Sequence, residues 1–316
     1  MSFSSNVKEE LARHIGSARH CLIAETAAII NMCGKVSHGT DGKINGLKIQ
    51  TENAAVARKC FTLLKKTYNI KIEVSIRRNQ YLNKHRVYLI YIWDRDSALK
   101  VLRASKLLDG EDIKRQISPM IIQSTCCRRV YIRGAFLASG SLSDPEKTYH
   151  LEIVNQDKNH AEALAELINS FGMDSKIIRR KKYYVVYLKE GRQIVDLLNI
   201  MEAHVALMDL ENLRILKEMR NNVNRIVNCE TANLGKTVSA AVKQLDDIEY
   251  IEASKGIHTL SEPLEVMARL RLEHPSASLK ELGELLDPVV GKSGVNHRLR
   301  KIGQIADKLR NEDGVS

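Results

Sequence analysis

The chain lacks the sequence features of membrane and secreted proteins. No apolar run approaches the roughly 18 residues that a membrane span needs. The first ten residues, from Met1 to Glu10, contain no apolar core of a signal peptide and instead begin like an N-capped helix. We therefore expect a cytoplasmic protein that does not enter the membrane.

The cysteines also lack the spacing of a metal site or a redox motif. None of the six forms a CxxC pair or stands with histidine at zinc-site spacing. The adjacent Cys126 and Cys127 leave a redox-active pair open, but buried or free thiols are the favoured interpretation. The sequence thus predicts no cofactor and no metal ion.

Motifs of common hydrolases and nucleotide-binding enzymes are absent as well. The patterns GxxxxGK[ST], HExxH and GxSxG do not occur, and the ten histidines are scattered along the chain. Nothing in these patterns points to an enzyme.

A helix-like segment of small and apolar residues, by contrast, is present twice. The copies run from Thr26 to Gly34 and from Ile132 to Gly140, so their final glycines lie 106 residues apart. After each copy the sequence predicts a strand, a helix and strands rich in bases, over 47–50, 53–67, 71–78 and 86–92, and over 151–154, 158–170 and 175–188. This shared order is typical of a duplicated domain, with two unrelated core helices as the alternative.

Both segments resemble the paired helices of the LAGLIDADG homing endonucleases. In that family the helices pack along their small residues, and the acid before each final glycine holds a metal ion. Here those positions are Cys33 and Ser139, which are poor ligands for Mg²⁺. Neither Glu25 nor Asp144 is spaced to replace the missing acids at the helix ends. The resemblance implies an α+β fold without catalytic residues.

The net charge of +11 is concentrated in this duplicated part. Residues 1–201 hold 33 Lys and Arg against 20 Asp and Glu, whereas 202–260 hold 7 against 9 and 261–316 hold 9 against 9. The bases cluster in the predicted strands, at Arg77, Arg78, Lys84 and Arg86, and at Arg179, Arg180, Lys181 and Lys182. In the nuclease fold these sheets form a saddle on DNA; solvated hairpin ends are the alternative.

The C-terminal residues 261–316 predict three helices. The first ends before Pro275, and Ser278 and Glu281 form a capping box that opens the second. A third follows Gly291. The residues expected to face the core are Leu264, Met267, Ala268 and Leu270 in the first helix, Leu279, Leu282, Leu285 and Leu286 in the second, and Val295, Leu299, Ile302, Ala306 and Leu309 in the third. This arrangement predicts an all-α helix-turn-helix domain, with a turn about two residues longer than the tight form.

The polar face of the third helix supplies candidate DNA contacts. Asn296 and Arg300 suit bidentate contacts to bases, while Lys280, Lys292, Arg298 and Lys301 suit phosphates. The full candidate set is Ser278, Lys280, Lys292, Ser293, Asn296, His297, Arg298, Arg300, Lys301 and Gln304. A three-helix bundle that binds protein is the alternative.

The region 202–260 predicts two helices separated by a break. Asparagine is frequent here and favours caps and turns, so we expect the break near 228–235. Arg225, Asn228, Asn233 and Lys236 belong either to a structured hinge or to additional DNA contacts. The predicted domains are therefore 1–201, with repeats at about 19–106 and 126–201, then 202–260 and 261–316.

These features, in this order, closely resemble the WhiA family of Gram-positive bacteria. The resemblance covers nearly the whole chain, and the Asn-rich segment 223–233 is its most specific part. It implies a nucleoid-associated, sequence-specific regulator of transcription that binds double-stranded DNA, without nuclease activity, in cell division, chromosome segregation or sporulation. RNA polymerase, or a WhiB-type iron–sulfur regulator in actinobacteria, is an expected partner. The alternatives are a protein-binding scaffold of the division machinery and a residual DNA endonuclease.

Overall fold

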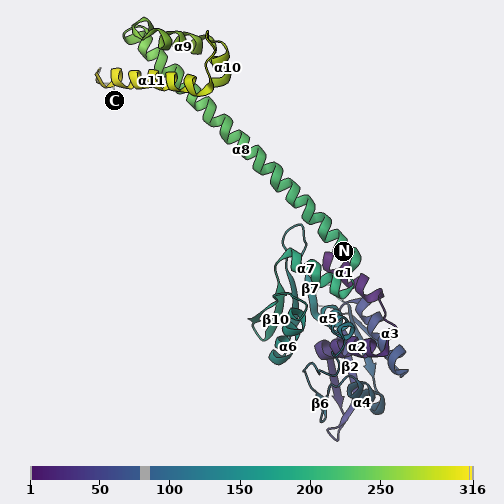
Figure 1. Cartoon of the computed structure of the whole chain (residues 1–316). Helices are drawn as coiled ribbons and strands as arrows, with labels where there is room; N and C mark the ends of the chain where they lie inside the picture. Colours follow the sequence, from purple (N-terminus) through teal and green to yellow (C-terminus); the bar gives the residue numbers. More distant parts are fainter. Residues whose placement is uncertain (1, 79–85, 313, 315–316) are drawn as a thin grey trace. The chain divides into compact units, whose positions relative to one another are not determined.

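The computed structural model describes residues 2–78, 86–312 and 314 of the chain. These form two compact units, Met1–Lys217 and Glu218–Ser316 (Figure 1). The boundary lies inside the 51-residue helix α8 (His204–Ser254). The range 202–260, expected as a separate region, therefore contributes to both units. No helix in the described part of the chain is long and apolar enough to cross a membrane.

The N-terminal unit contains one structural pattern twice. The first copy consists of α2 (Arg19–Cys33), β1 (Gly34–His38), β2 (Ile44–Thr51), α3 (Ala54–Tyr68), β3 (Glu73–Arg78), β4 (Arg86–Ile92) and α4 (Arg95–Ala104). The second consists of α5 (Thr125–Ser139), β7 (Gly140–Leu142), β8 (Leu151–Asn155), α6 (Lys158–Asn169), β9 (Lys176–Arg180), β10 (Tyr183–Leu188) and α7 (Gly191–Met201). Their antiparallel sheets have matching strand orders, β1-β2-β4-β3 and β7-β8-β10-β9. The predicted duplication and α+β class are confirmed.

One helix, a short hairpin and the first part of α8 also belong to this unit. Helix α1 (Phe3–Arg13) begins at the expected cap, because the Ser2 hydroxyl accepts a hydrogen bond from the Ser5 amide at 3.2 Å. The strands β5 (Leu108–Asp109) and β6 (Asp112–Ile113) form a short hairpin between the two copies.

Helices α2 and α5 pack against each other at the centre of the unit. Both contain 15 residues, and their first residues are 106 apart, as are their last. A Cβ atom added at Gly134 would lie 2.7 Å from Glu25 O and 2.9 Å from Ala28 Cβ. The absent side chain at this position therefore permits the close approach of the two helices.

The C-terminal unit is built on the second half of α8. The shorter elements after it are η1 (Ile257–Thr259), α9 (Glu262–Glu273), α10 (Leu279–Glu284) and α11 (Lys292–Glu312). Their core contains Ile248 and Ile251 of α8, Leu264 and Met267 of α9, Leu282, Leu286, and the predicted stripe Val295, Leu299, Ile302, Ala306 and Leu309 of α11. The expectation for Leu285 is wrong, since this side chain is 52% exposed just after α10 ends.

The predicted break near 228–235 is also wrong. Helix α8 runs through this segment without interruption. Asn228 and Asn233 are exposed, and each reduces helix stability relative to alanine by less than about 1 kcal/mol. Thr237 adds a side-chain hydrogen bond to the Asn233 carbonyl at 2.9 Å. The asparagine-rich segment therefore forms helix, although asparagine favours caps and turns.

Candidate nucleic-acid interface

The short helix α10 begins with both hydrogen bonds of a capping box. Glu281 N donates to Ser278 Oγ at 3.3 Å, and Ser278 N donates to Glu281 Oε2 at 2.6 Å. The bond from the Ser278 amide holds the pKa of the exposed Glu281 carboxyl below its usual value. The predicted role of Ser278 as the N-cap is confirmed.

The turn between α10 and α11 folds back onto α10. Val290 N donates to Gly283 O at 3.0 Å, and a Cβ atom added at Gly283 would lie 2.1 Å from Val290 O. A side chain at Gly283 would therefore push the turn away. This contact fixes the turn before α11, and α11 begins at Lys292, directly after Gly291 as predicted.

Helix α11 separates its buried and polar residues as the sequence predicts. Seven of the ten candidate residues are exposed on it: Lys292, Ser293, Asn296, His297, Arg300, Lys301 and Gln304. Arg298 lies at the flank and is half-buried. Because a helix repeats every 3.6 residues, Lys292, Asn296 and Arg300 lie in one row along it. This row combines a phosphate-binding cation with two side chains suited to base edges.

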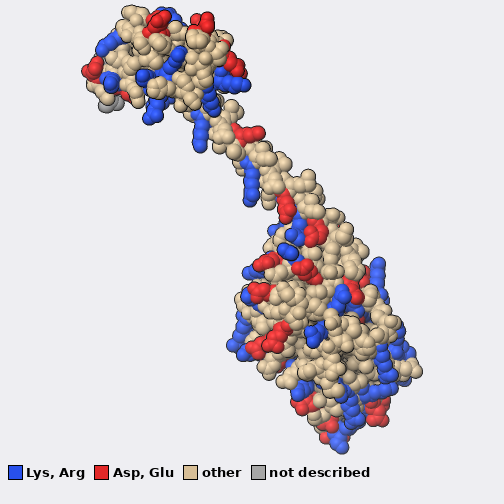
Figure 2. Space-filling model, in the orientation of Figure 1, with Lys and Arg blue, Asp and Glu red and all other residues tan. Residues whose placement is uncertain are grey.

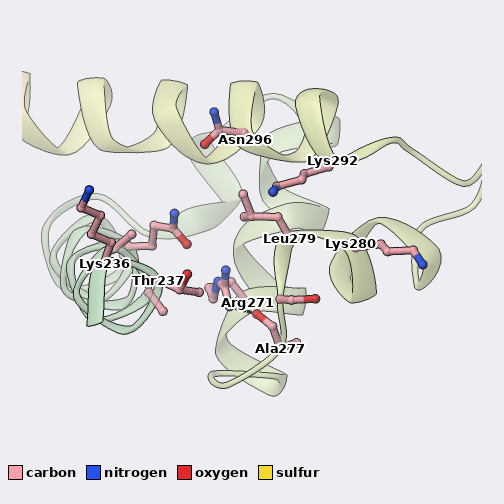
Figure 3. Close-up of a pocket in the computed structure, with 12 residues that line it drawn as sticks. Lys236, Thr237, Arg271, Ala277, Leu279, Lys280, Lys292 and Asn296 are labelled. Atoms are coloured by element: carbon pink, nitrogen blue, oxygen red, sulfur yellow. Dashed lines mark hydrogen bonds between the residues drawn. The ribbon is translucent and has the colours of Figure 1, made fainter. Parts of the chain in front are cut away.

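A basic pocket of about 450 Å³ lies beside the first turns of α11 (Figure 3). Of the described residues that line it, four are cations and none is acidic. The cations are Lys236 of α8, Arg271 of α9, Lys280 of α10 and Lys292 of α11. Four separate helices thus each contribute a cation to the lining of one pocket, which suits a phosphate group.

Arg271 has a different environment from the three lysines. Its side chain is 2% exposed, and its Nη1 donates to Ala277 O at 2.7 Å. Burial lowers its pKa from the usual value, and its Nε has no hydrogen-bond partner within the described residues. Arg271 therefore holds the loop that leads to Ser278 and adds charge behind the pocket.

The α8 candidates divide between the pocket and the helix surface. Lys236 lines the pocket together with Ser278, Lys280, Lys292 and Asn296. Arg225, Asn228 and Asn233 are exposed on α8 but do not line it. The structure brings five predicted residues to one place, although Lys236 is 42 residues before Ser278.

The helix ends that hold metal in homing endonucleases have a cationic environment in this chain. Arg115 donates through Nη1 to Asn31 O and through Nη2 to Gly34 O, the latter at 2.8 Å. Burial raises the pKa of the Cys33 thiol to about 12, while Arg115 and Lys8 act in the opposite direction. Ser139 Oγ is buried and unpartnered among the described residues.

Neither alternative acid reaches these helix ends. Glu25 is buried against Lys59 and Arg133 in the middle of the helix pair, at 2.6 and 2.8 Å. Asp144 is exposed and accepts a hydrogen bond from Glu146 N in a turn. The prediction that they do not replace the missing acids is confirmed.

The outer face of the first sheet carries more bases than acids. Its register places Lys35, Lys48 and Arg77, with one acid, Glu73, on the face opposite the core residues Ile49 and Ile90. Lys48 Nζ lies 5.7 Å from the Tyr91 ring centroid. Sequence reasoning missed Lys35 and Lys48, which alternation along the strands would have identified. Figure 2 shows Lys and Arg side chains spread over this unit among fewer acids.

The predicted bases of the second sheet do not share one face. Arg180 lies on the outer face but pairs with Glu152 at 3.1 Å, whereas Arg179 points to the opposite face. Lys181 and Lys182 lie in the turn between β9 and β10. In the first sheet, Lys84 lies outside the described residues.

One group of side chains has the geometry of a metal site. His20, Cys21, Cys126 and Cys127 place one potential ligand atom each within 4.8 Å of all the others. Their spacing along the sequence gave no indication of this group, because two of them come from each repeat.

Comparisons with known proteins extend over both units. Family models described as "WhiA N-terminal LAGLIDADG-like domain", "WhiA LAGLIDADG-like domain" and "WhiA C-terminal HTH domain" match residues 19–108, 128–220 and 223–306. A relative from Lachnoclostridium phytofermentans is 54% identical over 98% of this chain and 100% of its own length. Another from Alkaliphilus oremlandii is 55% identical over 98% of each. Both carry the name "Probable cell division protein WhiA".

Among solved structures, full-length WhiA from Thermatoga maritima has a similar fold. It superposes with a TM-score of 0.60 at 24% identity, covering 98% of this chain and 99% of that one. This match supports the fold alone.

Proposed function

Because this chain belongs to the WhiA family, we propose that it is a sequence-specific regulator of cell division that binds double-stranded DNA without cleaving it. The main support for DNA binding is the exposed row of Lys292, Asn296 and Arg300 on α11, which begins at a pocket lined by four cations. The relatives' names support the role in cell division.

In this proposal α11 is the recognition helix. Asn296 reads adenine and Arg300 reads guanine through paired hydrogen bonds in the major groove. Ser293, His297, Lys301 and Gln304 are exposed on the same side and extend the contact, and Arg298 meets the backbone at the flank. Side chains that contact bases can do so only when phosphate contacts hold the recognition helix in a fixed position on the DNA.

In this proposal the basic pocket binds the phosphate that holds α11 in position on the DNA. A backbone phosphate bound there meets Lys236, Lys280 and Lys292, while the capped start of α10 holds Ser278 beside it. Lys280 also lies 3.7 Å from Glu284, a weak exposed pair that phosphate can replace. Arg225, Asn228 and Asn233 extend the contact along α8.

The N-terminal unit adds sequence-independent affinity through the basic outer face of its first sheet. Lys35, Lys48 and Arg77 supply the charge. The segment 179–182 is a weaker candidate, since Arg180 is already paired. The total charge of +13 over residues 1–201 supports an electrostatic role.

The same unit is proposed to lack nuclease activity. Phosphodiester cleavage by this fold needs Mg²⁺ held by hard oxygen ligands, and Cys33 provides sulfur instead. Arg115 and Lys8 add positive charge near that thiol, which opposes a divalent cation. We propose regulation of transcription at bound sites, on the nucleoid, as the way in which this protein acts on division.

A double variant of the recognition helix tests the proposal. Genome-wide mapping would first identify bound sites for use in fluorescence anisotropy with the purified chain. Asn296→Ala with Arg300→Ala should weaken binding to those sites by about 10- to 100-fold per lost contact. Arg269→Ala is the matched control, because Arg269 pairs with Glu265 on α9. If specific affinity and its salt dependence both persist, α11 is not the reader, and a protein-binding scaffold is favoured.

Nuclease activity needs a separate assay. Plasmid incubated with the chain and Mg²⁺ or Mn²⁺ should remain intact. Cleavage that disappears in Cys33→Ala or Ser139→Ala would contradict the proposal and establish an active endonuclease.

A further inference from the structure

The first turns of α2 and α5 bring three thiols and an imidazole together. His20 Nδ1 lies 3.0 Å from Cys127 Sγ and 3.4 Å from Cys21 Sγ. Including Cys126, all four ligand atoms lie within 4.8 Å of one another. In a tetrahedral zinc site with one nitrogen and three sulfur ligands, the ligand atoms lie about 3.5 to 3.8 Å apart, given Zn–S near 2.3 Å and Zn–N near 2.0 Å. We propose that His20, Cys21, Cys126 and Cys127 bind one zinc ion that joins the two repeats.

The four residues occupy equivalent positions in the duplicated structure. His20 corresponds to Cys126 and Cys21 to Cys127, both at the separation of 106 residues that relates the two helices. Each helix thus contributes two adjacent ligands from its first turn. The site lies at the opposite end of the helix pair from Cys33 and Ser139, and is therefore distinct from the position where a homing endonuclease holds metal.

The chemistry of the donors selects the ion. Thiolate and imidazole ligands favour zinc over Mg²⁺ or Ca²⁺, which take oxygen ligands. Three thiolates and a neutral imidazole leave a complex with one net negative charge. The N-terminal ends of two helices, which carry positive partial charge, offset that charge. As the ion binds, each thiol releases its proton to solvent.

Burial and access are both compatible with metal loading. Cys21 and Cys127 are buried, whereas His20 and Cys126 are exposed. A pocket of about 350 Å³ reaches Cys21 and Cys126. The two arginines that also line it are engaged elsewhere, because Arg133 pairs with Glu25 and Glu202 and Arg129 donates to the Ile200 carbonyl. An ion can therefore enter from the side of the exposed ligands and become partly enclosed.

A disulfide between two of these cysteines would account for the arrangement of the four side chains less well than a metal ion does. A disulfide would use two of the four side chains and give no role to His20, whose ring nitrogen faces two different sulfur atoms. It would also leave a third thiol unused beside the pair. Metal binding uses all four atoms.

Titration of the full chain with Co²⁺ tests the site. The reduced, metal-free protein should bind one equivalent and show the thiolate-to-cobalt charge-transfer band and the strong ligand-field bands of tetrahedral cobalt. Zn²⁺ should displace these signals. Cys126→Ser and His20→Ala, which change exposed residues, should each weaken Co²⁺ binding by at least about 100-fold. Cys229→Ser, which changes an exposed thiol on α8, should leave binding unchanged.

Three results would overturn the proposal. The first is the absence of a charge-transfer band in the reduced full chain. The second is unchanged Co²⁺ affinity in both Cys126→Ser and His20→Ala, with native circular dichroism showing that they fold. The third is a disulfide between Cys21 and Cys126 or Cys127 that forms, by mass spectrometry, although equimolar Zn²⁺ is present. DNA binding by α11 is measured separately and does not depend on these results.

Discussion

Glu25 of α2 and Arg133 of α5 form an ion pair inside the interface between the two repeats. Arg133 Nε lies 2.8 Å from Glu25 Oε1, and each side chain is 1% exposed. Lys59 Nζ of α3 lies 2.6 Å from the same oxygen, and Glu202 accepts a hydrogen bond from Arg133 Nη1. One buried group of charges thus connects α2, α3, α5 and the end of α7. Removing one charge leaves its partners buried without full compensation.

Replacing Arg133 should therefore strongly destabilise the N-terminal unit. Arg133→Met keeps most of the side-chain volume but leaves Glu25 with Lys59 alone, so we expect a loss of about 3 to 5 kcal/mol in the free energy of unfolding. Urea denaturation followed by the fluorescence of Trp93, the single tryptophan, reports on this unit. Arg13→Met, which removes an exposed cation 3.8 Å from Glu9, should change the free energy by less than about 1 kcal/mol. Equal stabilities would show that the buried pair is dispensable.

Two glycine-to-alanine substitutions should have opposite effects. A methyl group at Gly134 would meet Glu25 O and Ala28 Cβ, so the helix pair must separate at a cost of about 1 to 3 kcal/mol. Gly235 lies within α8 with open space around its Cα, so alanine there should stabilise the helix by up to about 1 kcal/mol. Thermal unfolding by circular dichroism compares the two variants. Destabilisation by Gly235→Ala would mean that α8 is not continuous there.

Acid should destabilise the N-terminal unit through His160. Its ring is buried between Asn155 Oδ1, 2.7 Å from Nδ1, and the Tyr131 hydroxyl, 3.0 Å from Nε2. Asn155 donates through Nδ2 to Ile153 O, so its Oδ1 accepts from Nδ1–H and Nε2 accepts from Tyr131. This network holds the imidazole neutral, and burial lowers the pKa of His160 from 6.5 to about 4.

The sign of the effect follows from proton binding. Between pH 6.5 and 4 the unfolded chain binds a proton at His160 and the folded chain does not, so stability falls as the pH falls. The full contribution is about 3 kcal/mol. Urea denaturation at pH 7 and pH 4.5 should show a smaller loss for His160→Gln than for the unmodified chain. His38→Gln, which changes an exposed histidine, is the control and should keep the pH dependence of the unmodified chain. If His160→Gln also kept that dependence, the loss of stability at acid pH would come from another group.

Sequence reasoning succeeded where one periodic pattern determines the local structure. The stripe from Val295 to Leu309 and the capping box at Ser278 identify α11 and α10 because both signals involve neighbours on one helix. The repeated helices were found because their small and apolar residues recur 106 residues later in the sequence. The Asn-rich segment failed as a predictor, since exposed asparagine lowers helix stability only slightly and α8 continues through it.

Contacts between distant segments could not be predicted from these patterns. The basic pocket needs Lys236 of α8 beside α10 and α11, and the thiol group needs the first turns of both repeats to meet. Pairing of Arg180 with Glu152, which removes a predicted free cation, depends on strand register. Spacing along one strand or helix carries none of this information.

The lysines of the pocket should contribute to DNA affinity independently of sequence. In the proposed complex Lys236 contacts one phosphate. Lys236→Gln should therefore make the negative slope of log affinity against log salt concentration shallower by about 0.9. Binding to specific and to unrelated DNA should weaken by the same factor, because a phosphate contact does not distinguish bases. Fluorescence anisotropy over a range of salt concentrations measures both quantities. Lys255→Gln is the control, since Lys255 pairs with Glu312 at the far end of α8. An unchanged slope for Lys236→Gln, or a loss confined to specific DNA, would remove Lys236 from the phosphate-binding set.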